Sequence, residues 1–439
     1  MNHSHEVVVI GGGPAGSVAA LLLARAGVSV CVLEKAKHPR FHIGESILPR
    51  NLPLIQDLGL EPALRRLPHL PKYGAEFGIG NDPKTIRFGF SDGLLPGSPT
   101  FNIERSHFDK MLLDEARAAG AEVFEETAVR KVLRLEEGHV EVATADRNFR
   151  GRVLLDCSGQ ATLVARHLGT RRGFDDPHLQ KVAYFAHFEN VERLTGQDSG
   201  HPAIFMCREG WFWLIGLSET KTSVGFVTRP SFVREIDSRP DRLLQWAIAR
   251  APAVRQRMRY ATGPAINDVL CDFSYACNPL AGPGYFLVGD AGSFLDPIFS
   301  TGVTLAMIGA REAARHTIDI LRERTAPATA RKAYCRFVKG STGVFWRLIR
   351  SYYRHSFREL FMNGRGPLKV HGAVISALAG QVFPKPVWSL RWRLMFFDLC
   401  VQVQEFIPLC PMRAECSLLN ETPVDPEIGK RALETAEAL

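Results

Sequence analysis

The sequence lacks the signatures of several large protein classes. Its nine cysteines form no CxxC pair and no histidine-rich zinc spacing, so we predict neither a disulfide scaffold nor a metal site. We expect reduced thiols and a cytoplasmic protein. The apolar stretch at residues 373–379 is too short to cross a bilayer, and no transmembrane helix is expected. No charged segment followed by an apolar run opens the chain, so we expect no secretion signal.

Long runs of one charge are also missing. Lysine and arginine exceed aspartate and glutamate by 54 to 46, a formal net charge of +8 that is spread along the chain. Such a balance attracts anionic cofactors or partners but does not predict binding to nucleic acid. Hydrophobic residues make up 46% and charged residues 23%, which is typical of globular proteins. Because 439 residues exceed what one compact core usually holds, we expect at least two lobes.

The first forty residues read as one strand, helix, strand unit. Residues 7–10 are a short β-branched run, residues 17–25 are rich in alanine and leucine, and residues 28–33 form a second apolar run. The first and third segments predict parallel buried strands, and the second predicts a helix. This order is that of a dinucleotide-binding βαβ unit.

Three glycines and an acid give this unit its chemistry. Gly11 allows a sharp turn, Gly13 lets the backbone approach a pyrophosphate, and Gly16 lets the helix pack closely on the strand. The helix N-terminus then favours the phosphates, and Glu34 stands where an acid accepts the ribose hydroxyls of adenosine. The predicted cofactor contacts of this unit are Gly11, Gly13, Pro14, Ala15, Gly16, Glu34 and Lys35.

A distant segment favours FAD over NAD. Residues 284–290 form a strand that ends in Gly289 and Asp290, whose carboxylate and following turn would hold the ribityl-phosphate end of a flavin. Arg105 lies between a strand-like segment and a helix, at residues 100–103 and 108–119. Two readings of Arg105 stay open, a contact with the anionic side of the cofactor and a surface arginine in an ion pair.

The pattern of elements predicts an α/β protein with three regions. Aromatic strand-like segments at residues 182–188 and 210–217 indicate a sheet-rich lobe, and a helix is expected at about 303–322. Beyond about residue 326 the chain is aromatic, basic and helical in spacing. We expect a discontinuous FAD-binding Rossmann-like domain (1–70, 100–170 and 263–325), a β-rich substrate domain (71–99 and 171–262) and a helical C-terminal cap (326–439).

Four further motifs occur in order along the chain. They are Gly44-Glu45-Ser46 with Pro49, the lysine of Lys72-Tyr-Gly-Ala-Glu-Phe, Trp211-x-Trp213-x-Ile215, and Phe294-x-x-Pro297-x-x-Ser300-x-Gly302. With these residues the chain resembles the flavin-dependent halogenases, in the group that halogenates phenols and pyrroles, over roughly residues 5–330. The resemblance implies an FAD-binding fold of the glutathione reductase and aromatic hydroxylase type. It places Glu45 and Ser46 beside the flavin.

The resemblance also implies roles for a second set of residues, each with a plainer alternative. Trp211 and Trp213 point to one face of a strand and would wall the substrate off from the flavin, or they are ordinary core residues. Lys72 lies among apolar neighbours, where burial would lower its pKa and free an amine to guide hypohalous acid, or it is a surface lysine. A turn could aim backbone N–H groups at a halide, or Ser300 is a helix cap. The predicted halide residues are Pro297, Ser300, Thr301 and Gly302.

Two positions depart from the family pattern. Gly216 stands where the tryptophan motif should end in proline. Phe299 stands where tryptophan halogenases carry a glutamate that assists proton transfer from indole. The missing acid disfavours tryptophan as substrate and suits a phenol or pyrrole, which loses its proton without that help.

The resulting prediction is an FADH2-dependent halogenase, an oxidoreductase that installs chlorine or bromine on an electron-rich aromatic through hypohalous acid. Its cofactor is FAD, reduced by a separate flavin reductase, and it consumes O2 and chloride or bromide. The substrate is either free or tethered to an acyl or peptidyl carrier protein. Three alternatives stay open: a polyprenyl reductase of the geranylgeranyl type, an aromatic hydroxylase, and a flavin-binding protein without catalysis.

Overall fold

The computed structural model describes residues 2–411 except 80–81, 175–178, 237–238, 266, 272–273, 295 and 365. Residues 412–439 of the expected C-terminal cap, with Cys416, lie outside the described residues. The eight described cysteines are free thiols. Contacts divide the chain into two compact units, which are Met1–Pro68, Glu104–Gly173 and Ser274–Phe345 in the first and His69–Ile103, Phe174–Phe273 and Trp346–Leu439 in the second. The functional division into cofactor, substrate and cap domains stays a prediction.

The first unit is built on a six-stranded sheet. Its strands follow the order β20-β21-β12-β2-β3-β8, and every neighbouring pair is parallel except β20 with β21. The run at residues 7–10 is indeed a strand, buried along its whole length, as a parallel strand covered on both faces requires. The bounds are β2 Val7–Ile10, β3 Val30–Leu33, β8 Glu122–Phe124, β12 Val153–Asp156, β20 Ala281–Gly282 and β21 Tyr285–Leu287.

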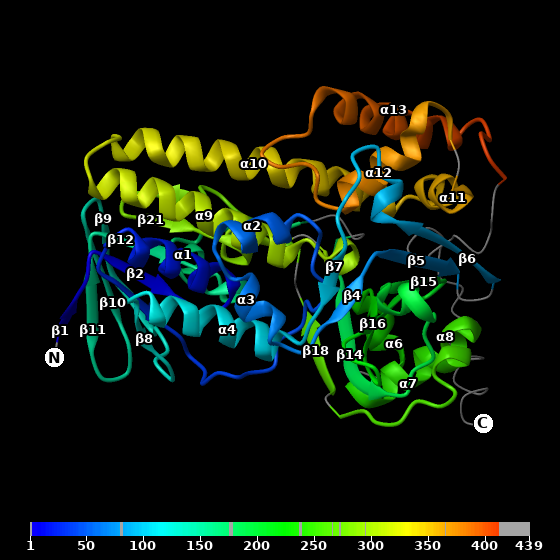
Figure 1. Ribbon diagram of the computed structural model, residues 1–439, viewed down its shortest axis with the longest axis horizontal. Coiled ribbons are helices and arrows are strands. Elements are labelled where there is room, and N and C mark those ends of the chain that lie inside the picture. Colours follow the sequence, from blue (N-terminus) through cyan, green and yellow to red (C-terminus); the bar gives the residue numbers. More distant parts are fainter. Residues whose placement is uncertain are drawn as a thin grey trace. The chain divides into compact units, whose positions relative to one another are not determined.

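Helices of the first unit pack against this sheet and each other. Helix α1 contacts both α4 and α9, and Figure 1 shows α9 and α10 running alongside one another. Helix α1 begins at Pro14, three residues earlier than predicted, because proline is tolerated in a first turn. The helices are α1 Pro14–Arg25, α2 Asn51–Asp57, α3 Glu61–Arg65, α4 Arg105–Ala118, α5 Leu163–His167, α9 Gly302–Leu321 and α10 Pro327–Tyr352, the last continuing into the second unit.

Two smaller sheets and several short 3-10 turns complete this unit. A four-stranded sheet contains β1 Asn2–Ser4, β9 Lys131–Glu136, β10 His139–Ala143 and β11 Asn148–Gly151. A three-stranded sheet contains β13 Arg171–Gly173, β19 Tyr275–Cys277 and β22 Ser293–Phe294. The 3-10 turns are η2 Gly159–Ala161, η4 Gly289–Ala291 and η5 Pro297–Phe299.

The second unit is built on a seven-stranded sheet of order β18-β14-β17-β16-β15-β5-β6. Neighbouring strands are antiparallel except β15 and β5. The strands are β5 Gly74–Ile79, β6 Asp82–Gly89, β14 Val182–Glu189, β15 Ala203–Cys207, β16 Gly210–Gly216, β17 Lys221–Thr228 and β18 Asn267–Cys271, and a separate pair is formed by β4 Leu70–Lys72 and β7 Thr100–Asn102.

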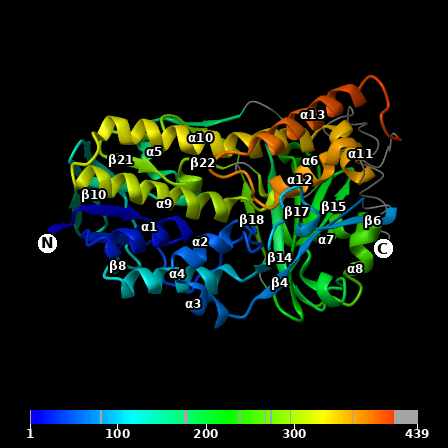
Figure 2. The same cartoon turned by 45° about the horizontal axis from the view of Figure 1, so that its top comes forward.

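Helices occur in this unit where the sequence predicted mainly strands. Three of them, α6 to α8, lie between β17 and β18, so the region is less uniformly β-rich than expected. The expected helical C-terminal region is confirmed up to the last described residue by α10 to α13 (Figure 2). The bounds are α6 Pro230–Ile236, α7 Pro240–Arg250, α8 Pro252–Arg257, α11 His355–Asn363, α12 Val370–Leu378 and α13 Trp388–Gln404, with 3-10 turns η1 Phe90–Asp92, η3 Gly196–Gly200 and η6 Pro367–Lys369. None of the helices in the described ranges is both long and apolar enough to cross a membrane.

The seven-stranded sheet is apolar on both faces. One face packs Phe205, Phe212 and Phe226 against Leu243 of α7 and Val254 of α8. Since side chains alternate along a strand, the opposite face carries the tryptophans of β16. Phe77 of β5 meets Phe361 of α11 edge to face, with ring centroids 5.0 Å apart. The sheet therefore separates two aromatic layers.

One glycine makes room on the tryptophan face. Gly225 of β17 pairs with Trp213 on one side and with Phe185 of β14 on the other. A Cβ at Gly225 would lie 2.1 Å from the indole of Trp213. The two aromatic rings meet over this gap, with centroids 6.0 Å apart.

Gly225→Ala should therefore displace the Trp213 indole. Overpacking of this kind lowers the free energy of unfolding by about 1–3 kcal/mol, which urea unfolding measures, and near-ultraviolet circular dichroism should change with it. As a control, Gly343→Ala in α10 meets no atom within 4 Å and should raise stability by about 1 kcal/mol, because alanine is the better helix former. Equal effects of the two changes would contradict this packing.

Candidate active site

The predicted glycine turn has three distinct geometries. Gly11 takes φ +100°, and a Cβ there would lie 2.4 Å from the carbonyl oxygen of Cys157. A Cβ on Gly16 would lie 1.8 Å from the carbonyl oxygen of Gly11, so helix and turn touch through backbone alone. Gly13, the N-cap of α1, is open, with a guanidinium nitrogen of Arg40 the nearest atom at 3.5 Å. Two glycines thus serve packing, and the third leaves space in front of the helix.

Glu34 faces this turn from the end of β3. Its carboxylate is 3% exposed and accepts hydrogen bonds from the N–H groups of Gly12 at 2.6 Å and Ala36 at 2.9 Å. Arg40 lies 3.7 Å from the same carboxylate. Two N–H donors leave lone pairs on a carboxylate for further partners. Lys35, the next predicted contact, is exposed.

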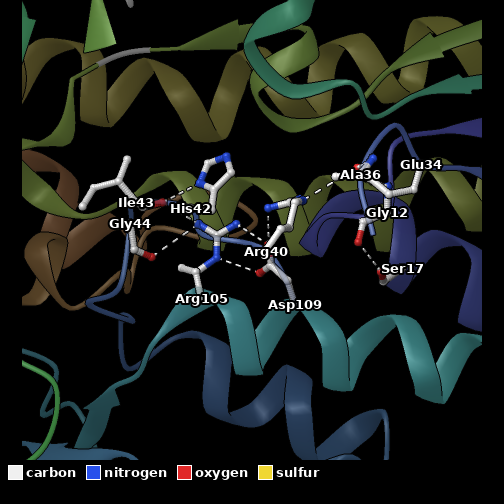
Figure 3. A network of polar contacts seen from close by, with 10 residues as sticks. All are labelled: Gly12, Ser17, Glu34, Ala36, Arg40, His42, Ile43, Gly44, Arg105 and Asp109. Atoms are coloured by element: carbon white, nitrogen blue, oxygen red, sulfur yellow. Dashed lines mark hydrogen bonds and ion pairs between the residues drawn. The ribbon is translucent and has the colours of Figure 1, made fainter. Parts of the chain in front are cut away.

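Arg105 and Asp109 form the buried centre of the network in Figure 3. The guanidinium donates two hydrogen bonds, at 2.7 and 3.0 Å, to the carboxylate of Asp109 one helical turn later. Burial by itself raises the pKa of Asp109, but Arg105 and Arg40, the latter at 3.3 Å, hold it below its usual value. Arg105 thus forms an ion pair but is buried, so the reading of it as a surface arginine is wrong, and its predicted contact with the cofactor stays a prediction.

Arg105 also fixes the loop that carries Glu45 and Ser46. It donates to the carbonyl oxygen of Ile43 at 2.8 Å, and its Nη1 lies 3.0 Å from where a Cβ on Gly44 would be. Gly44 has φ +102°, a conformation that side chains disfavour. Glu45 and Ser46 are 1% and 3% exposed. One arginine thus ties helix α4 to a buried loop.

Gly289 and Asp290 belong to the 3-10 turn η4, which packs against α9. Gly289 has φ +62°, and a Cβ there would lie 3.0 Å from Cα of Ala306. The backbone carbonyl of Asp290 accepts a hydrogen bond from Tyr275 at 2.7 Å. Burial raises the pKa of the Asp290 carboxyl to about 6, and the charge of Arg105 opposes the rise.

The predicted halide segment bends sharply before α9. Pro297–Phe299 is a right-handed 3-10 turn, Ser300 is left-handed at φ 52°, and Thr301 returns to the right-handed region. Such an alternation turns successive N–H groups into one concavity, which binds anions. Ser300 is not the N-cap of α9, which is Thr301, but it is the C-cap residue of the 3-10 turn η5.

These residues of the first unit fit FAD. The space at Gly13 and an α1 first turn without a side-chain cap suit a pyrophosphate. Glu34 stands at the spacing after the glycine turn that a ribose contact needs. The space at Gly302, also a predicted cofactor contact, is open, since a Cβ there meets only a carboxylate oxygen of Asp290 at 3.9 Å. The cofactor contacts themselves stay predictions.

Lys72 belongs to the second unit and is buried. It ends strand β4 opposite Thr100 of β7 and is 3% exposed. Its ammonium nitrogen lies 5.3 Å from the centroid of the Phe90 ring. Burial lowers the pKa of Lys72 to about 7. The surface reading of this lysine is therefore wrong, and its predicted catalytic role stays a prediction.

Trp211 and Trp213 share one face of β16, as predicted, with ring centroids 6.0 Å apart. Both are buried. The indole N–H of Trp211 donates to the hydroxyl of Tyr353 at 3.0 Å, and that of Trp213 donates to Ser223 at 3.2 Å. Each large ring is therefore held by packing and by one directed bond.

An arginine fills the space that the missing motif proline would need. A Cβ on Gly216 would lie 1.8 Å from Nη1 of Arg193. The Nη2 of Arg193 donates to the carbonyl oxygens of Ser218, at 2.8 Å, and Glu219. The glycine thus leaves β16 intact and accommodates a guanidinium.

Sequence reasoning missed four residues that contact the predicted site residues. Asp109 had a signal, since an acid four residues after Arg105 on a helix predicts an ion pair. Arg40, Tyr353 and Gly225 had none, because each acts on a residue remote in sequence. All predicted cofactor and halide residues belong to the first unit, whereas Lys72, Trp211 and Trp213 belong to the second.

Comparisons with known proteins agree with this chemistry. A family model described as "FAD binding domain" matches residues 4–334. A 1H-pyrrole-2-carbonyl-[peptidyl-carrier protein] chlorinase of Pseudomonas fluorescens is 28% identical over 80% of this chain and 84% of its own length. The corresponding brominase of Pseudoalteromonas luteoviolacea is 34% identical, covering 72% and 78%. A tryptophan 2-halogenase of Chondromyces crocatus is 31% identical, covering 81% and 69%.

The fold has solved counterparts. The structure of the flavin-dependent brominase Bmp2 superposes with a TM-score of 0.78 at 26% identity, covering 99% of each chain. A structure described as a flavoprotein/dehydrogenase from Cytophaga hutchinsonii also superposes, with a TM-score of 0.83 at 27% identity, covering 92% of this chain and 100% of that one. The three relatives and the brominase named above are halogenases.

Gly13→Val should abolish retention of FAD while the protein still folds. The branched side chain enters the open space in front of α1, where it displaces the pyrophosphate rather than protein atoms. Flavin absorbance relative to protein absorbance measures the loss, and thermal unfolding measures the fold. Purified Gly13→Val protein with its full flavin content would disprove this assignment.

Gly16→Ala is the matched comparison. Its methyl group meets the Gly11 carbonyl, so this smaller change should lower the unfolding temperature.

Lys72→Met should make stability less dependent on pH. The folded pKa of about 7 lies below the ordinary value of 10.5, so between these values the unfolded chain holds more protons. The free energy of unfolding of the native protein therefore rises with pH across this window. The methionine variant should be the more stable below pH 7, and its advantage should shrink toward pH 10. Urea unfolding at several pH values tests this, with exposed Lys131→Met as control; parallel profiles for Lys72→Met and the native chain would refute it.

Proposed function

We propose that the chain halogenates an electron-rich aromatic ring and that the buried amine of Lys72 guides the halogen. The chain belongs to the flavin-dependent halogenases, which are FAD-dependent oxidoreductases that use O2 and halide. The observation that carries the proposal is the burial of Lys72 and its lowered pKa. A protein retains a buried lysine at a cost, because a charged ammonium loses its hydration there. Perturbed groups of this kind are concentrated at functional sites.

The chain's own residues would bind the cofactor in the first unit. Gly13 and the α1 N-terminus would receive the pyrophosphate, Glu34 would accept the ribose hydroxyls, and Asp290 would hold the ribityl end. The chemistry supplied by bound reduced FAD is the reduction of O2 that oxidises chloride or bromide to hypohalous acid.

The segment before α9 would hold the halide. Thr301 and Gly302 present backbone N–H groups just after the left-handed bend at Ser300, whose own N–H donates to the carbonyl oxygen of Pro297 at 3.0 Å. The bend and the helix N-terminus both favour an anion. Pro297 fixes the start of the bend. Support comes from backbone geometry, so either chloride or bromide fits.

Lys72 would receive and orient hypohalous acid. Near neutral pH both the amine and the ammonium are present, because the pKa is about 7. The ammonium donates hydrogen bonds to the oxidant, and the neutral amine is nucleophilic enough to form a haloamine. Either form places electrophilic halogen at one fixed point rather than releasing it.

Trp211 and Trp213 would form the wall that keeps the ring from the cofactor. Their indoles fill one face of β16 and are held by Tyr353 and Ser223. Direct oxygen delivery, as in an aromatic hydroxylase, requires an open approach that this wall blocks. The buried Phe299 supplies no acid, which favours a ring that loses its proton without help, such as a pyrrole or phenol.

We propose a carrier-tethered pyrrole or phenol as the substrate class. Two relatives are named for pyrrole-2-carbonyl groups on a peptidyl carrier protein, one a chlorinase and one a brominase. A third relative is named for tryptophan, so a free indole belongs in any substrate panel. A separate flavin reductase is the proposed source of FADH2.

Lys72→Ala should bind FAD normally yet lose the halogenated product by about 100-fold or more, the scale on which loss of a catalytic group acts. The residue lies outside the cofactor unit, so flavin content should not change. Reduced flavin should still consume O2 and halide, and the leaked oxidant should chlorinate monochlorodimedone. Mass spectrometry of the product and absorbance of the trap measure the two effects.

Lys72→Arg is the control for charge alone. It keeps a cation but offers no amine of lowered pKa, so product should also fall if the amine matters. A yield of halogenated product from Lys72→Ala close to that of the native chain would disprove the proposed mechanism.

A further inference from the structure

Helix α13 is apolar on two opposite sides. Leu390, Phe397 and Val401 are buried on one side. The other side carries a stripe at i, i+4, i+7 and i+11 spacing, here named the α13 stripe: Trp388, Trp392, Met395 and Leu399. Three of its members are exposed, Trp388 to 78%. A helix that is apolar all round is ordinarily buried, so the exposed side indicates a missing partner.

The buried side of α13 is firmly seated. Phe397 meets Phe357 of α11 edge to face at 5.3 Å, and Gln404 donates to the carboxylate of Glu359 at 2.8 Å. The helix also packs against α12, and Figures 1 and 2 both show α13 lying on α11 and α12. The α13 stripe is therefore exposed on a helix whose opposite side is packed against the protein. Phe406, Ile407 and Leu409 extend the apolar surface beyond its end.

Three exposed cations lie on α13 and on the segments before it, and are here named the cationic rim: Lys369, Lys385 and Arg391. Within the described part of the chain none of them forms an ion pair. Glu405, after α13, forms an ion pair with Arg354, and Asp398 of α13 accepts a hydrogen bond from the hydroxyl of Ser351. The region therefore combines apolar anchors with exposed cations.

We propose that the α13 stripe docks the acidic helical face of a peptidyl carrier protein. This inference rests on the proposed function, because it needs a carrier-tethered substrate. Apolar side chains of the carrier cover the tryptophans, and its carboxylates face the cationic rim. A second copy of the chain fits less well, since a two-fold contact places the same cations against each other.

Packing contacts connect the helix of the α13 stripe to the loop beside Lys72. Helix α12 packs against α13 and accepts two hydrogen bonds from the loop that follows η1: the Leu94 N–H donates to the carbonyl oxygen of Gly372 at 2.8 Å, and the Leu95 N–H donates to the Ser376 hydroxyl at 2.8 Å. This loop follows Phe90, whose ring lies beside the Lys72 ammonium. Helix α12 and the loop after η1 thus lie between α13 and the amine, and all of these elements belong to one compact unit.

The test uses two thioesters of pyrrole-2-carboxylate as substrates, one on a peptidyl carrier protein and one on free pantetheine. It compares the native chain with the double variant Trp388→Ala/Met395→Ala and with the charge reversal Arg391→Glu. On the carrier thioester, kcat/KM should fall about 30-fold for the double variant, the scale of an interface hot spot, and about 10-fold for the charge reversal. On pantetheine thioester both variants should match the native chain. Arg66→Glu, an exposed arginine of the first unit, is the matched control and should change neither.

The outcomes separate the two ideas. Equal loss on both thioesters, or no loss on the carrier thioester, overturns the docking surface while the halogenase function stands. No halogenation of either thioester by the native chain overturns the carrier-tethered substrate and the docking surface with it. If the native chain forms a dimer that the double variant does not form, the α13 stripe is an interface with a second copy of the chain. If the double variant loses binding to phosphatidylserine vesicles but keeps its kcat/KM on the carrier thioester, the stripe binds a membrane.

Discussion

The contact between backbone atoms of Gly11 and Gly16 is the constraint on which the first unit depends. No side chain fits between them, since a Cβ on Gly16 would overlap the Gly11 carbonyl oxygen. This contact brings the N-terminus of α1 directly above the end of β2, and from there α1 packs on α4 and α9. Helix α4 then presents Arg105 to the loop of Glu45, and α9 presents its first turn beside Asp290. The cofactor and halide residues thus share one scaffold.

Local sequence patterns predicted the parts of this scaffold that short-range physics decides. The β-branched run, the glycine turn and the helix at residues 302–321 follow from periodicity and from backbone freedom, and all three are present. The network of Arg40, Asp109 and Glu34 was not predictable in the same way, because its members meet only after folding. Three helices after β17 were missed, since the surrounding aromatic strands dominated the pattern.

Two glycines of the second unit act in the same way. Gly225 and Gly216 are strand glycines, and each leaves space that a remote side chain occupies, the Trp213 indole in one case and the Arg193 guanidinium in the other. A sequence shows that such a glycine is present but not what fills the gap. The family motif therefore survives at Gly216 with an altered residue, because the strand needs the backbone and not the proline ring.

Two buried charged groups, one in each unit, obey opposite rules. Asp109 is surrounded by arginines, which keep it ionised, and it acts as a fixed structural anchor. For Lys72 burial is the one cause of its lowered pKa, so it is held near the midpoint between amine and ammonium at neutral pH. A structural ion pair gains nothing from such a midpoint, whereas a group that must both hold an oxidant and pass on its halogen requires both forms. The physical chemistry that makes Lys72 costly to the fold is therefore the chemistry that suits it to the proposed reaction.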